Sequence, residues 1–317
     1  MSFTKIFKKG VTAISAFGIS SVLLVSAADG QQMSHRLDVA AGNNLYCAGY
    51  VQTSPIDTSR TVIGGFNEQD GFLYAENDEI YVNAGANRGV KEGDLMSVVR
   101  PRGQVSTRWS NKNGLGFYVQ EVGVVEVVRV KTEYSVVRAK TSCDTFLLGD
   151  LVRPYQERTS PEYAKRAELD RFADPTGKAR GRVFMARDNQ QMVTRDQIVY
   201  VDLGAEDNVR TGDYLTFYRP LGKGNLFHGP PESASARSYG YSSLTYRGGK
   251  FSNQTPRKSG EQARGRVVTS QKAKEGRPEI RKVVGEGMIV NVKERTATVV
   301  ITRTVQEIHT GDWVEVQ

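Results

Sequence analysis

Histidine and cysteine, from which many catalytic and metal sites are built, are scarce in this sequence. Three histidines (His35, His228 and His309) and two cysteines occur among 317 residues. No zinc-protease, nucleophile-elbow, phosphate-loop or paired-cysteine motif is present. Metal and acid–base sites need several such side chains held together on rigid elements. We therefore expect a protein that is not an enzyme and that carries no metal and no cofactor.

Long hydrophobic runs are also missing, since crossing a bilayer takes about 20 apolar residues. The uncharged, largely apolar stretch of residues 11–25 is shorter and follows a lysine-rich start. Small residues come next, with Val25 and Ala27 at the −3 and −1 positions of a cleavage site. This layout is typical of a secretory signal peptide. We predict that residues 1–27 are removed, that the chain is exported to the periplasm or cell envelope, and that the mature chain has no transmembrane segment.

The two cysteines are Cys47 and Cys143. In an oxidising compartment an even number of cysteines favours a disulfide. A reactive thiol, the alternative, would want a basic residue or a histidine beside it, and neither cysteine has one adjacent in sequence. A bond between them would close a loop of about one hundred residues and stabilise the fold by several kcal/mol.

An internal repeat organises the chain. Residues 80–101 align without a gap with residues 199–220, and nine of the 22 positions are identical. Residues 122–153 also align without a gap within residues 284–317. The first offset is 119 positions and the second is 162, because the second copy carries an insertion. The sequence therefore predicts two copies of one unit, each built in two halves.

Each half ends in a Gly-Asp pair followed by an apolar strand. Glycine supplies the positive φ of a tight turn, and the aspartate carboxylate accepts hydrogen bonds from nearby backbone N–H groups. A calcium site would need several oxygens within one loop, so turn capping is the favoured interpretation. The pairs are Gly93-Asp94, Gly149-Asp150, Gly212-Asp213 and Gly311-Asp312.

Short β-branched strands separated by glycine turns predict a mainly β protein. We expect two tandem small β-barrels, SH3-like or β-clip, over residues 28–155 and 176–317. The linker of residues 156–175 contains Ser160-Pro161-Glu162, which has the features of a helix start. A short helix is therefore predicted over residues 163–172.

The insertion in the second copy spans residues 221–282. It holds thirteen Lys or Arg against four Glu, whereas the net charge of the whole chain is +8. A segment so polar cannot bury enough apolar area to offset its ordering entropy, so we predict a disordered loop. It is either a solvated insertion or a contact for an anionic envelope polymer or an acidic partner. The candidate contacts are Arg237, Arg247, Lys250, Arg257, Lys258, Arg264 and Arg266.

The repeat core resembles a known family. Residues 80–82, with Gly85, Gly89 and Gly93-Asp94, are similar to the C-terminal domain of flagellar assembly protein T and related periplasmic envelope proteins. The second copy has Asn208 in place of Gly89. The resemblance implies a β-rich, periplasmic, non-catalytic protein attached to a larger envelope assembly.

Two functions from different classes follow. The first is a structural or adaptor role in a periplasmic or cell-surface assembly, with an envelope protein complex or an anionic envelope polymer as partner. The alternative is a glycan- or peptidoglycan-binding module that uses Trp109, Phe117 and Tyr118 as its platform, although this loop could instead cover the open end of a barrel. Export argues against nucleic acid as a partner.

Overall fold

The computed structural model describes residues 37–40, 43–66, 73–164, 166–221 and 277–317. The predicted signal peptide, His35, His228 and the seven candidate basic contacts of the insertion lie outside these residues. The described part of the chain is mainly β, as predicted. Its helices are the four-residue α1 (Asn43–Tyr46) and three single 3₁₀ turns. No helix in this part is long and apolar enough to cross a membrane.

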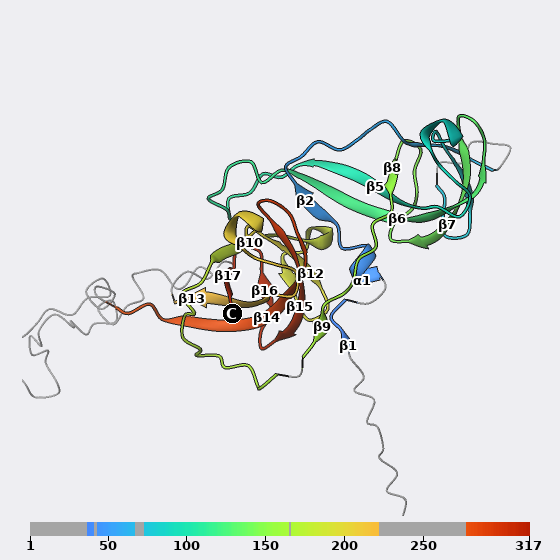
Figure 1. Ribbon diagram of the computed structural model, residues 1–317. Helices are drawn as coiled ribbons and strands as arrows, with labels where there is room; N and C mark the ends of the chain where they lie inside the picture. The colour runs from blue at the N-terminus through green and yellow to red at the C-terminus, as the bar shows by residue number, and fades with distance from the viewer. Residues whose placement is uncertain (1–36, 41–42, 67–72, 165, 222–276) are drawn as a thin grey trace, which may run out of the picture. The chain divides into compact units, whose positions relative to one another are not determined.

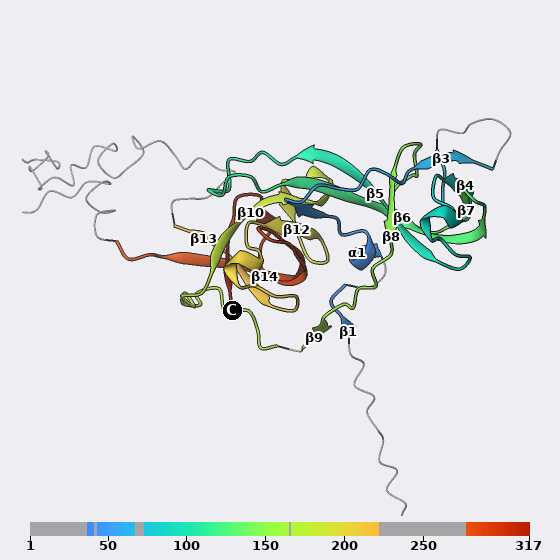
Figure 2. The ribbon, with the colours of Figure 1, turned by 45° about the horizontal axis from the view of Figure 1, so that its top comes forward.

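The first half of the chain forms a seven-stranded antiparallel sheet, called here the first sheet (Figure 1). Its order is β3-β4-β7-β6-β5-β8, and β2 pairs with the far end of β6. Figure 2 shows β5 and β6 running side by side as a long hairpin. The strands are β2 (Tyr50–Gln52), β3 (Val62–Gly65), β4 (Glu79–Val82), β5 (Leu95–Gln104), β6 (Phe117–Val130), β7 (Ser135–Ser142) and β8 (Leu151–Pro154).

The second half forms a closed six-stranded barrel in the order β10-β12-β15-β14-β13-β17. A short ribbon of β11 (Met192–Val193) and β16 (Ile308–His309) accompanies it. The barrel strands are β10 (Arg180–Ala186), β12 (Ile198–Val201), β13 (Tyr214–Pro220), β14 (Arg281–Val292), β15 (Ala297–Thr304) and β17 (Trp313–Val316).

The first sheet repeats the strand order of the barrel. Its outer strands are also joined, because the Val62 N–H donates to the Asp150 carbonyl at 2.9 Å. In the barrel the Val183 N–H donates to the Asp312 carbonyl at the same distance. Even the bulge in the first strand recurs, after Val62 in one copy and after Val183 in the other. The duplication seen in the sequence is therefore a duplication of strand order and register, and residues from Arg36 onward form one compact unit.

Each copy has its own apolar core of aligned residues. Val62, Ile80, Val82, Val98 and Phe146 are buried in the first sheet. The equivalent positions in the barrel core are Val183, Val199, Val201, Phe217 and Ile308. β-Branched residues dominate both cores, as expected for strands that pack one face inward.

The helix predicted over residues 163–172 is absent from the described residues. Instead, Glu162 and Tyr163 form β9, which pairs with β1 (Leu37–Asp38). Downstream, the Arg171 carbonyl accepts a hydrogen bond from the Val283 N–H of the barrel at 3.0 Å. A helix of ten residues is marginal alone, and hydrogen bonds to the rest of the fold outweigh the local capping signal.

The four Gly-Asp turns share one geometry. Each glycine has a positive φ, between 86° and 95°. In each turn the aspartate N–H donates to the carbonyl three residues earlier, and its carboxylate accepts from that residue's N–H. The carboxylate bonds are Lys91 N to Asp94 (2.8 Å), Leu147 N to Asp150 (2.8 Å), Arg210 N to Asp213 (2.7 Å) and His309 N to Asp312 (2.7 Å).

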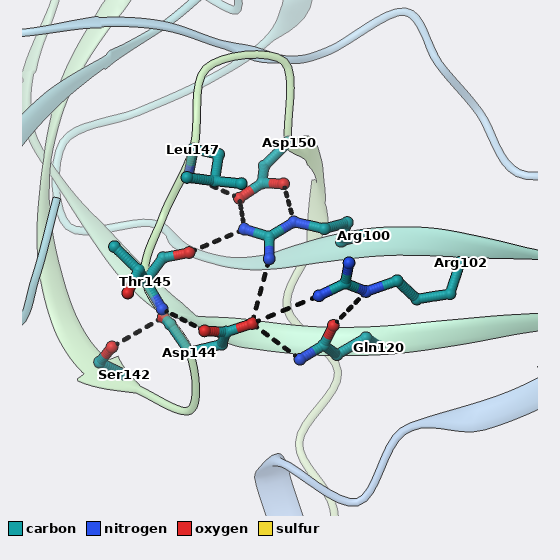
Figure 3. Close-up of polar contacts among 8 residues, drawn as sticks. All are labelled: Arg100, Arg102, Gln120, Ser142, Asp144, Thr145, Leu147 and Asp150. Atoms are coloured by element: carbon teal, nitrogen blue, oxygen red, sulfur yellow. Dashed lines mark hydrogen bonds and ion pairs between the residues drawn. The ribbon is translucent and has the colours of Figure 1, made fainter. Parts of the chain in front are cut away.

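Two of these aspartates also hold an arginine. Arg100 donates from Nε and Nη2 to the two carboxylate oxygens of Asp150, at 2.7 and 2.8 Å (Figure 3). Arg219 forms the same fork with Asp312, at 2.8 Å for both bonds. In both copies the arginine also donates to a backbone carbonyl of the preceding turn. These bidentate pairs tie β5 or β13 to the turn before the last strand of the same copy.

We predict that removing the capping aspartate lowers the free energy of unfolding by different amounts in two otherwise equivalent turns. Asp94 is exposed and caps its turn only, so Asp94→Ala should lower the free energy of unfolding by about 1 kcal/mol. Asp150 is buried and Asp150→Ala leaves the Arg100 guanidinium without its main partner, so the loss should be about 3 kcal/mol or more. Chemical denaturation of the two variants measures the difference. Equal losses would contradict a structural role for the fork.

His309 makes the barrel sensitive to acid. It is buried in the turn that Asp312 caps. Leu147 occupies the equivalent position in the first sheet. Burial, and secondarily Arg219, lower the pKa of His309, against the opposing effect of Asp312 and Glu307. The unfolded chain therefore binds a proton at His309 more readily than the folded chain does. The contribution of the neutral imidazole to stability is present above a pH of about 6.5 and is lost as the pH falls below it.

We expect His309→Leu to remove this loss. Denaturation of the wild type and the variant between about pH 7.5 and 5.5 should show the variant gaining stability relative to the wild type as the pH falls. A constant difference across this range would show that His309 does not titrate in the transition.

Candidate functional site

A buried stretch of chain lies between the first sheet and the barrel. We call residues 45–51 the joining segment. Tyr50 packs against Val99, Val119 and Leu151 of the first sheet. Ala48 and Val51 instead belong to a cluster with barrel residues, among them Phe184 and Tyr200. Adjacent side chains in an extended strand point to opposite faces, so one short strand packs against the first sheet with one face and against the barrel with the other.

Three barrel hydroxyls hold the backbone of the joining segment. Gly49 is required at its centre, because its φ is +64° and a Cβ there would lie 3.0 Å from the Tyr200 hydroxyl. All three donors are buried, which makes each bond costly to lose. The bonds run from Tyr200 Oη to the Ala48 carbonyl (2.6 Å), from Thr298 Oγ1 to the Gly49 carbonyl (3.1 Å) and from Thr296 Oγ1 to the Val51 carbonyl (2.8 Å).

Glu121 is the buried charge of this junction. Its carboxylate accepts a hydrogen bond from the Gly49 N–H at 3.1 Å and pairs with Arg158 through both oxygens. Arg153 lies 3.4 Å away on the same carboxylate. Glu121 is on β6, Gly49 is in the joining segment and Arg158 follows β8. The carboxylate therefore joins three separate segments of the chain. A buried carboxylate needs such partners to remain charged.

Positive charge exceeds negative charge around Tyr50. The Lys293 ammonium lies 4.5 Å from the Tyr50 ring centroid and the Arg153 guanidinium 5.0 Å from it. Burial, followed by repulsion from Arg153 and Arg158, lowers the pKa of Lys293. Burial also raises the pKa of Tyr50. The cations therefore stack on an aromatic ring that stays neutral, and the arrangement anchors the junction.

A second contact comes from the excursion between β5 and β6, residues 105–116, called here the arm. Ser110 donates to the buried Asp202 of the barrel at 2.7 Å. Lys112 pairs with Asp207 at 2.5 Å and with Glu206 at 2.6 Å. Burial raises the pKa of Asp202, and the hydrogen bond from Ser110 offsets part of this rise. The arm thus binds the barrel through the Ser110 hydrogen bond and the two Lys112 ion pairs.

The aromatic residues considered for glycan binding lie in the arm and at the start of β6. Trp109 is half-buried, with the Arg108 guanidinium 4.3 Å and the Arg182 guanidinium 5.1 Å from its ring. Tyr118 packs edge-on against Tyr200 at 5.4 Å. Phe117 is 42% exposed. Two of the three aromatic residues, Trp109 and Tyr118, therefore pack against the barrel.

A polar groove runs beside the arm. Its volume is about 480 Å³, and residues of both the first sheet and the barrel line it. The walls carry hydrogen-bonding groups, among them those of Arg102, Gln104, Gln120, Asp188 and Asn189.

The disulfide between Cys47 and Cys143 is formed, with the two Cα atoms 5.4 Å apart, so this prediction is confirmed. It ties the joining segment to the end of β7, 96 positions away in sequence. The bond holds the segment on the first sheet while the three hydroxyls hold it on the barrel.

Other sequence candidates bear on the site less directly. The Gly-Asp residues form turns before strands, and none of their side chains is hydrogen-bonded to the joining segment within the described residues. No group of His, Cys, Asp and Glu side chains within the described residues could hold a metal ion. No protein-family model matches the chain, and no curated protein matches it.

Sequence reasoning missed the central residues of the junction. Glu121, Arg158 and Tyr200 were not singled out for a role there. One signal existed for Glu121, which interrupts the β-branched run of β6 and so indicates either an exposed position or a buried charge with a partner. The repeat itself carried another, because Thr296 and Thr298 stand where the first copy has Tyr134 and Val136.

The disulfide should stabilise the junction strongly. The double variant Cys47→Ser/Cys143→Ser should lose about 3–5 kcal/mol of unfolding free energy, as expected for closure of a loop this long. Denaturation without reductant compares it with the wild type. The wild type in excess reductant should fall to the level of the variant, and coincident curves for all three samples would contradict this prediction.

Proposed function

We propose that this chain is a non-catalytic, exported envelope protein with a structural or adaptor role in a periplasmic or cell-surface assembly. One observation carries the proposal: the buried polar groups of the junction are spent on holding two copies of one β unit together. Glu121, the three hydroxyls and the disulfide all serve that purpose. Such an arrangement suits a rigid body that presents surfaces to other molecules.

Export is part of the same proposal. The disulfide is compatible with an oxidising compartment, and the predicted signal peptide supplies the route. We also propose that the two copies correspond to two tandem domains, since each has its own core and the same strand order.

The basic insertion would act as a tether. It stands between β13 and β14, the position that the arm occupies between β5 and β6 of the first copy. The arm binds the barrel partly through the Lys112 ion pairs. A longer and far more basic excursion at the equivalent place suits an anionic envelope polymer or an acidic partner protein.

A glycan- or peptidoglycan-binding module is the second candidate. The polar groove beside the arm favours it, because its amide, carboxylate and guanidinium groups match the hydrogen-bonding needs of a sugar chain. Retention on purified peptidoglycan that depends on Gln104 and Asn189, and not on the insertion, would support this function over the tether.

The tether is tested on isolated envelopes. Deletion of residues 225–280 should lower retention of the purified chain at low salt by at least about fivefold, and high salt should lower wild-type retention to the same level. A matched variant keeps the length of the insertion and replaces Arg237, Arg247, Lys250, Arg257, Lys258, Arg264 and Arg266 by Gln.

The matched variant should behave as the deletion does, since the proposal rests on charge. Unchanged retention of both variants would leave the insertion as a solvated loop. Cross-linking in intact cells tests the wider adaptor role, and recovery of a small-molecule ligand with no protein or polymer would contradict it.

A further inference from the structure

The outer face of β3, β4 and β7 in the first sheet is open. We call its residues Ile63, Tyr81, Tyr134 and Val136 the open face. Ile63 is 49% exposed and Tyr134 39% exposed. The rings of Tyr81 and Tyr134 meet edge-to-face at 5.9 Å. Large apolar side chains gathered on one exposed sheet surface indicate an interaction site.

The same face of the barrel is covered, and the repeat shows by what. Phe184, Tyr200, Thr296 and Thr298 stand at the four equivalent positions, and each is buried. Their cover is the joining segment, whose carbonyls accept the bonds from the tyrosine and the two threonines. The fold thus demonstrates on one copy that this face takes an extended polypeptide.

The burial patterns of equivalent strands record the difference. In β12 all four residues are buried, whereas in β4 buried and half-buried residues alternate. Tyr81 keeps the position and ring of Tyr200, but its hydroxyl has no hydrogen-bond partner among the described residues. The donor that holds the joining segment on the barrel is therefore present on the first sheet without an acceptor.

A hollow of about 310 Å³ opens above Tyr81, lined also by Ile63, Gly64, Gly65 and Tyr134. The fold needs Gly65, because a Cβ there would lie 2.1 Å from the Tyr74 ring. It does not need Gly64, whose Cβ would be in ordinary contact with Tyr81 at 3.5 Å. The barrel has Met185 at the position of Gly64. The hollow thus results from an omitted side chain that the strand could carry.

The far end of the face is charged. Glu79 and Arg138 form an exposed ion pair at 2.8 Å, where the barrel has the buried apolar pair of Ile198 and Val300. This end suits a solvent-exposed surface that is not permanently covered. An occupant must therefore present apolar groups toward Ile63 and a polar group toward Arg138.

We propose that the open face is a docking site for an extended segment of another protein. The segment lies across β4 as the joining segment lies across β12. One of its backbone carbonyls accepts the hydrogen bond of Tyr81, and one of its apolar side chains fills the hollow left by Gly64. This proposal rests on the adaptor role and names the surface and the chemistry of the partner.

Photo-cross-linking in the exporting cells tests the proposal with the full-length chain. A benzophenone amino acid is placed at Ile63 or at Tyr134, and at Met192, which is exposed on β11 beside the barrel, as the control. The Ile63 and Tyr134 probes should map by mass spectrometry to one segment of one other protein. The Met192 probe should not reach that segment.

Three variants in the Ile63-probe chain make the result specific. Gly64→Met restores the side chain found in the barrel and should reduce the cross-link by at least about tenfold without loss of thermal stability, because it fills the hollow. Tyr81→Phe keeps the ring and should reduce the cross-link about fivefold through one lost hydrogen bond. Arg195→Gln, in the exposed turn between β11 and β12 of the barrel, should leave it unchanged.

Cross-links to a second copy of this chain, to lipid or glycan, or to scattered proteins without a shared segment would overturn the proposal, and so would the absence of any cross-link. A cross-link yield that is unchanged in Gly64→Met and Tyr81→Phe would overturn it as well. Failure here is distinct from failure of the adaptor role. Loss of these cross-links with envelope retention intact removes the open face alone, whereas loss of retention with the cross-link intact removes the tether.

Discussion

The joining segment is the constraint on which the junction depends. Its Tyr50 side chain belongs to the first sheet and its Val51 side chain to the barrel, while the disulfide and the barrel hydroxyls hold its backbone between them. Moving the segment by one residue would exchange the two faces and take Tyr50 and Val51 out of the apolar clusters that they fill. The position of Gly49 follows from the same constraint, because only a residue without a side chain fits under the Tyr200 hydroxyl.

Glu121 gives this packing its specificity. An apolar side chain could fill the same space, and buried ion pairs are a poor source of net stability. The carboxylate instead selects one arrangement, because only there do the Gly49 N–H and Arg158 reach it together. Arg158 lies beyond β8, so the pair also fixes where the chain leaves the first sheet. A neutral junction of the same volume would lack this choice of register.

The parts of the fold that depend on local chemistry could be predicted from the sequence. The Gly-Asp turns, the strand repeat and the disulfide are of this kind, since a positive φ, a hydrogen-bonding carboxylate and an even cysteine pair carry their own physical signature. The helix over residues 163–172 failed for the opposite reason. Its capping signals were real, but Arg171 is hydrogen-bonded to Val283 of the barrel, and such a distant partner leaves no mark on the local sequence.

The junction lay beyond sequence reasoning for the same reason, and the repeat shows how it could have been approached. Aligned copies of one unit should differ at random on surfaces that serve no purpose. Here the two copies differ systematically. The barrel face has hydroxyls and apolar residues that contact the joining segment, whereas the equivalent face of the first sheet has an ion pair and a glycine in place of a larger side chain.

A duplicated unit starts with two equal faces, and one joining segment can cover only one of them. Once the barrel face is covered from within the chain, the other must become fully polar or gain a partner from outside. The face of the first sheet is polar at Glu79 and Arg138 but keeps apolar and aromatic side chains at Ile63, Tyr81 and Tyr134. Its retained aromatic and apolar groups are costly to expose and are not required by the core beneath them, which Val62, Ile80 and Val137 already fill.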